Sequence, residues 1–139
     1  MKAVGTRLLA LCFIILALAV QPAQAGSVGA DKVMRDWYRL VLELVRHTPT
    51  YSPPVASRAF AYLGVTAWEV TASADPAHRR SLAGQLTDFA APPPRQPGPH
   101  DEAVVLNAAL TAATQHFFGN TGPTGQRAMA AMAGKLDTT

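Results

Sequence analysis

Apolar residues recur at helical spacing between Asp31 and His47, while charged residues fall on the opposite side. This pattern predicts an amphipathic helix capped by Asp31. Pro53 and Pro54 belong to a turn that begins at Thr48, and proline suits the first turn of a following helix. The positions expected to face inward in the first helix are Val33, Trp37, Leu40, Val41, Leu44 and Val45.

A second helix is expected from about Pro54 to Ala72. Its only charges are Arg58 and Glu69, near its two ends, and the remainder is rich in alanine and aromatic residues. Helices that are apolar all round are usually buried on both faces. We therefore expect this helix to lie inside a larger assembly, with Ala56, Phe60, Leu63, Ala67 and Val70 available for one face.

The rest of the pattern predicts further helices and no strand. A short helix is expected over 79–89, then a Pro-rich loop at 91–100, then a helix opened by Asp101 and Glu102. A last helix should run from Pro123 to about Leu136. The fold class is therefore all-α, a partial helical bundle of four to five helices. The expected inward positions are Val105, Leu106, Ala109, Leu110, Ala113 and Phe117, followed by Met129, Met132, Ala133 and Leu136.

Residues 1–25 have the organisation of a signal peptide. Lys2 and Arg7 precede an apolar run, Leu8 to Val20, and Ala23-Gln24-Ala25 offers a cleavage site. The alternative is a membrane anchor, but this run is shorter than the roughly 20 residues that a bilayer requires. We expect an exported protein, periplasmic or secreted, without a stable membrane anchor after cleavage.

Cleavage would leave one domain, residues 26–139, without cysteine, because Cys12 lies in the apolar run. Disulfides, thiolate metal sites and a cysteine nucleophile are thereby excluded from the mature chain. Loss of Lys2 and Arg7 lowers the net charge from +3 to near +1. A charge this small gives no argument for a nucleic-acid partner.

The segment around the second helix resembles a known family. Trp37, the run Pro53-Pro54-Val55-Ala56-Ser57-Arg58-Ala59 and Ala67-Trp68-Glu69 are similar to the N-terminal helical region of vanadium-dependent haloperoxidases, a branch of the type 2 phosphatidic-acid-phosphatase (PAP2) superfamily. The resemblance spans roughly Val33 to Leu136. It implies an α-helical bundle whose active site binds vanadate in haloperoxidases or a substrate phosphate in phosphatases.

The family's catalytic motifs do not occur in this sequence. Lys32 is followed seven residues later by Arg39, but Leu40 stands where the family has proline, and there is no Ser-Gly-His. We therefore assign no catalytic, cofactor-binding or metal-binding residue, and vanadate is expected only in full-length relatives. We expect an N-terminal fragment, partnered by a missing C-terminal catalytic half or by further copies of itself.

Trp37, Arg58 and Glu69 are interpreted as structural residues. Arg58 is expected to pair with a carboxylate or with helix-capping carbonyls, since a buried guanidinium needs partners. Glu69 is expected to pair with a basic residue. His116 is expected to be a partly buried core histidine, and the four histidines do not have the spacing of a metal site: His47, His78, His100 and His116.

Three functions remain after these observations. The first is a secreted, truncated relative of the haloperoxidases and PAP2 phosphatases, without activity alone. The second is a stand-alone exported helical module that binds a partner through exposed apolar faces. The third, a small hydrolase using Glu69, Asp75 and a histidine, has no visible nucleophile and base pair.

Overall fold

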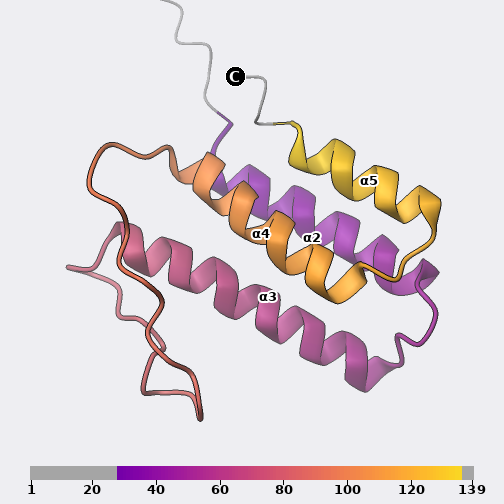
Figure 1. The fold of residues 1–139 in the computed structure, drawn as a ribbon, viewed down its shortest axis with the longest axis horizontal. Helices are drawn as coiled ribbons and strands as arrows, with labels where there is room; N and C mark the ends of the chain where they lie inside the picture. The colour runs from indigo at the N-terminus through magenta and orange to yellow at the C-terminus, as the bar shows by residue number, and fades with distance from the viewer. Residues whose placement is uncertain (1–27, 136–139) are drawn as a thin grey trace, which may run out of the picture.

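The computed structural model describes residues 28–135, which form four α-helices and no strand. Successive helices run in opposite directions (Figure 1). The expected all-α bundle of four to five helices is thus confirmed, with four. The signal peptide predicted at 1–25 and the inward position predicted for Leu136 lie outside the described residues. The helices are α2 (Ala30–His47), α3 (Pro53–Ala74), α4 (Glu102–Phe118) and α5 (Pro123–Ala133).

Helix α4 is the centre of the packing, because it contacts each of the other three helices. Helix α3 lies on one side of α4, while α2 and α5 also contact each other (Figure 1). The rings of Tyr38 in α2 and Phe60 in α3 contact each other, with centroids 5.8 Å apart. The most deeply buried large side chains are Trp37, Phe118, Leu63, Leu110, Met129 and Val41.

Helix α2 has the predicted amphipathic character, and it ends at His47 as expected. Its N-cap is Gly29 rather than the predicted Asp31, which lies in the first turn and pairs with Arg35 at 2.8 Å. An acidic group in the first turn still favours the helix, because the N-terminal end of a helix carries partial positive charge. The buried positions agree with those predicted from spacing: Val33, Trp37, Val41 and Leu44.

The prediction that α3 is buried on both faces was wrong, because only one of its faces is buried. Ala56, Ala59, Leu63 and Ala67 form that face, which packs on α4. The opposite face is exposed in the first half of the helix, including Arg58. The apolar sequence suggested burial all round, but no other helix of residues 28–135 lies against that side.

Helix α4 begins at the predicted point. The Asp101 carboxylate accepts hydrogen bonds from the backbone N–H groups of Ala103 (2.8 Å) and Val104 (3.2 Å), which is an N-cap interaction. The buried residues of α4 differ from the predicted inward positions, because two of them, Asn107 and Thr114, are polar. Burial of both follows from the central position of α4.

The two short turns meet at one end of the bundle (Figure 1). Thr48 Oγ1 donates to Thr121 Oγ1 at 3.0 Å, and the Tyr51 hydroxyl donates to the carbonyl oxygen of Phe117. The Tyr51 ring also stacks on Phe118, with centroids 4.5 Å apart. These contacts hold the α2–α3 turn against the α4–α5 turn.

The long connection 75–101 folds back on the second half of α3, and the helix predicted over 79–89 is not formed. The carboxylate of Glu69 accepts hydrogen bonds from Ser81 Oγ (2.8 Å) and from the Leu82 backbone N–H (2.6 Å). These bonds hold this segment in a series of turns rather than a helix. The predicted Pro-rich loop at 91–100 is confirmed, and Arg95 holds its end by two bonds to Glu102.

Thr114 supplies a prediction about stability. Its side-chain hydroxyl is fully buried and has no hydrogen-bond partner within the described part of the chain. Because Val has the same shape without the hydroxyl, Thr114→Val should raise the free energy of unfolding by about 1 kcal/mol. Urea denaturation monitored by circular dichroism measures this difference.

The matched control is Thr111→Val in the same helix. The Thr111 hydroxyl donates to the Asn107 carbonyl oxygen at 2.7 Å, so its loss should not stabilise the protein. Equal effects of the two substitutions would contradict the assignment of an unsatisfied group at Thr114.

Candidate functional site

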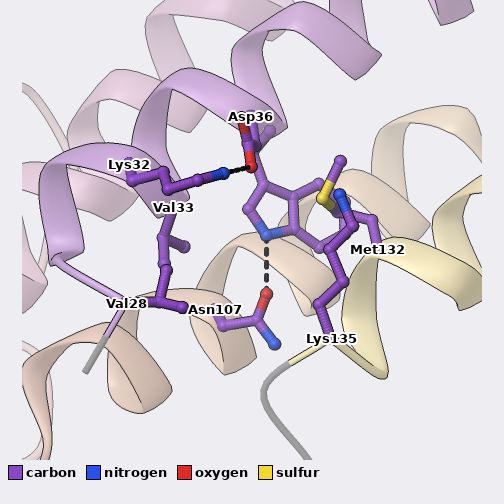
Figure 2. A pocket seen from close by; sticks show the side chains of 8 residues that line it. Val28, Lys32, Val33, Asp36, Asn107, Met132 and Lys135 are labelled. Carbon is purple, nitrogen blue, oxygen red and sulfur yellow. Dashed lines mark hydrogen bonds and ion pairs between the residues drawn. The ribbon is translucent and has the colours of Figure 1, made fainter. Parts of the chain in front are cut away.

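A cavity of about 240 Å³ lies between the N-terminal half of α2, the start of α4 and the end of α5. It is at the opposite end of α2 from the short turns. Figure 2 shows the side chains that line it. Its apolar lining consists of Val28, Val33, Trp37 and Met132.

One hydrogen-bonded network joins the three helices at this cavity. The indole N–H of Trp37 donates to Asn107 Oδ1 at 2.8 Å (Figure 2). Asn107 Nδ2 in turn donates to the carbonyl oxygen of Ala133 at 2.8 Å. Trp37 is 1% exposed and Asn107 is also buried. A buried indole and a buried amide each need such partners, so the two bonds fix the relative positions of α2, α4 and α5.

The polar part of the cavity contains Lys32, Asp36 and Lys135. The Lys32 ammonium lies 2.6 Å from Asp36 Oδ2, as Figure 2 shows. This hydrogen bond is the main reason that the pKa of Asp36 is lowered, and the charge of Lys135 lowers it further. Two cations therefore surround one carboxylate, which leaves an excess positive charge beside an apolar cavity.

The chemistry available here is that of binding. Among residues 28–135, the ionisable side chains that line the cavity are Lys32, Asp36 and Lys135. Within residues 28–135, no three histidine, cysteine or acidic side chains gather where they could hold a metal ion.

The three residues singled out from the sequence lie in different places. Trp37 is in the core and belongs to the network above. Glu69 binds the turn at Ser81 and Leu82, whereas a basic partner was expected. Arg58 is exposed on α3 and forms none of the ion pairs found in the described structure, so its expected burial was wrong.

The histidines are dispersed over the surface. His47 lies 3.7 Å from Glu43, His78 lies 2.7 Å from Asp75, and His100 contacts the Gln96 carbonyl oxygen. His116 is exposed, because it lies on the outer side of α4 beside Phe117, so the prediction of a core histidine was wrong.

Sequence reasoning missed Asn107, the residue that organises the cavity. A signal was present: Asn107 follows four apolar residues, Ala103 to Leu106, and precedes Ala108 to Leu110. An amide inside an apolar helix usually marks a specific buried hydrogen bond. The cavity itself could not be predicted, since it depends on how three helices meet.

Comparison with known proteins found no matching family model, curated protein or solved structure. The resemblance to the haloperoxidases and PAP2 phosphatases therefore remains a prediction from the residues. Among the helices of residues 28–135, none is long and apolar enough to cross a membrane.

The network predicts a large cost for removing the Asn107 amide. Asn107→Leu leaves the Trp37 indole N–H and the Ala133 carbonyl group without partners, so we expect a loss of about 3 kcal/mol in the free energy of unfolding. A double-mutant cycle with Trp37→Phe should give a coupling energy of about 1 kcal/mol or more.

Gln126→Leu is the matched control for this cycle. Its amide also donates to a backbone carbonyl, that of Gly119 at 2.8 Å, but at the surface. We expect its effect to stay within about 0.5 kcal/mol. A comparable loss from both substitutions would show that the buried network contributes no more to the free energy of unfolding than a surface hydrogen bond.

The Lys32 and Asp36 pair predicts a pH dependence. The pKa of Asp36 is lowered in the folded state, so its contribution to stability is present above the pKa of the unfolded carboxyl group and is lost as the pH falls through the folded value. The stability difference between the wild type and Lys32→Gln should therefore shrink below about pH 4. Urea titrations from neutral to acidic pH measure it.

Arg127→Gln is the control, since Arg127 contacts Thr124 rather than a carboxylate. Its effect on stability should not change over the same acidic range. A Lys32→Gln effect that is equally flat would contradict the pairing.

Proposed function

We propose that residues 28–135 are a helical packing scaffold of the vanadium haloperoxidase and PAP2 phosphatase kind, which supplies core and contact surface but no oxyanion ligand. The observation that carries this proposal is the outer face of α3. Val55 and Tyr62 are large apolar residues on its first half, and Tyr62 is 50% exposed. They lie in the segment, Pro53 to Glu69, on which the resemblance rests.

The two halves of α3 differ in a way that supports packing against a further element. In the second half, the connection 75–101 contacts the outer side: Trp68, which is 42% exposed, donates its indole N–H to the Arg80 carbonyl oxygen, and Glu69 binds Ser81. In the first half, Val55 and Arg58 are exposed, while Tyr62 is half exposed and stacks its ring on Phe117 of α4, with centroids 5.6 Å apart. Exposed apolar clusters of this kind are typical of contact surfaces.

A second function, a stand-alone exported binding module, is favoured by a different observation. The four helices share one core, and the two short turns are tied to each other through Tyr51 and Thr48. A chain with its own core can fold without a covering domain. The two proposals differ in the state of the α3 face in the isolated protein.

The test uses the mature chain, residues 26–139. A scaffold whose α3 face lacks its cover should bind a hydrophobic dye or self-associate, and the substitution Val55→Ser should reduce both without loss of helix. Dye fluorescence, gel filtration and circular dichroism measure these properties. Leu42→Ser on α2 is the matched control, since Leu42 is 53% exposed but lies on a helix rich in charge.

A monomer that melts cooperatively and binds no dye would favour the stand-alone module instead. Absence of an oxyanion ligand is tested separately by ⁵¹V NMR with orthovanadate, which the scaffold should not bind. A bound vanadate signal would contradict that part of the proposal.

A further inference from the structure

The cavity between α2, α4 and α5 is separate from the α3 face, because α3 contributes no residue to it. Its volume of about 240 Å³ exceeds the roughly 150 Å³ of an apolar cavity that holds benzene. A phenyl ring with a short side arm therefore fits by size. Binding in this cavity is therefore independent of the proposed scaffold function.

The walls and the rim differ in chemistry. Val33 and Met132 provide an apolar wall, and Trp37 adds an aromatic one (Figure 2). At the rim, Asp36 is already held by Lys32 at 2.6 Å and lies 3.8 Å from Arg39. Lys135 forms no ion pair among residues 28–135, but it is close enough to lower the pKa of Asp36 through its charge, so the rim carries more cationic groups than carboxylates.

Asn107 adds a hydrogen-bond donor at the wall. A side-chain amide carries two N–H donors, and Asn107 gives one to the Ala133 carbonyl oxygen. Within residues 28–135, the second donates to no protein acceptor. An oxygen acceptor on a ligand would satisfy this donor, which is costly to leave unused in a buried position.

We propose that this cavity binds a compact apolar monocarboxylate, with its ring or acyl body against Val33, Met132 and Trp37 and its carboxylate toward Lys135. The apolar walls select the body, and the excess of ammonium groups over carboxylates at the rim selects a negative charge. A neutral molecule of the same shape makes the apolar contacts but lacks the attraction to the ammonium groups.

The test is an NMR titration of the ¹⁵N-labelled mature chain with phenylacetate at constant ionic strength. The protein has two tryptophans, and only Trp37 lines the cavity. We expect the indole N–H signal of Trp37 to shift saturably, with a Kd on the order of 1 mM, while that of Trp68 stays in place. Phenylacetamide, the neutral counterpart, should bind about threefold more weakly.

Lys135→Gln should weaken phenylacetate binding about threefold and leave phenylacetamide unchanged. Arg127→Gln, which removes a charge from α5 at a position that does not line the cavity, should change neither, and equal melting temperatures show that both variants are folded. No saturable shift of Trp37, or equal binding of the two compounds, overturns the proposal. Binding that appears only in a Leu136→Ser variant also overturns it, because the protein's own C-terminal residues would then be the occupant.

Discussion

The side-chain amide of Asn107 is the interaction on which the arrangement of the helices most depends. It accepts from the indole of Trp37 and donates to the carbonyl oxygen of Ala133, so a single buried residue joins α2, α4 and α5. Apolar contacts tolerate small shifts of one helix along another, whereas a hydrogen bond is lost within a fraction of an ångström. The amide therefore selects one register among several that the apolar residues would allow.

The bundle is held differently at its two ends. Where the short turns meet, Thr48, Tyr51 and Phe118 fill the space with stacked rings and hydrogen bonds. At the other end, Trp37 and Asn107 hold the helices together but a cavity remains between them. The hydrogen bonds that fix the register therefore also position Trp37 and Asn107 in the cavity wall. The cavity thus results from the packing of these three helices.

Helical spacing in the sequence was sufficient to predict the fold class, the bounds of α2 and the start of α4. Helical spacing gave a wrong prediction where a single tertiary contact determined the local structure. The segment 79–89 has a sequence compatible with a helix, but Glu69 binds Ser81 and the Leu82 backbone in turns. Burial of α3 was also overestimated, because apolar composition shows that a face can be buried and does not show that a neighbour is there. The cavity residues come from three helices, and no local pattern relates Lys32, Asn107 and Lys135 before the chain is folded.

The exposed half of α3 and the cavity share no residue, so different positions in the sequence determine them. Among residues 28–135, helix α3 packs extensively only on α4. Its outer side carries exposed Val55, whereas Tyr62 also stacks on Phe117 of α4. The cavity side has the opposite character, since Trp37 and Asn107 serve both the core and the cavity wall. A change at exposed Val55 should therefore leave stability nearly constant, whereas changes to Trp37 or Asn107 alter stability and the cavity together.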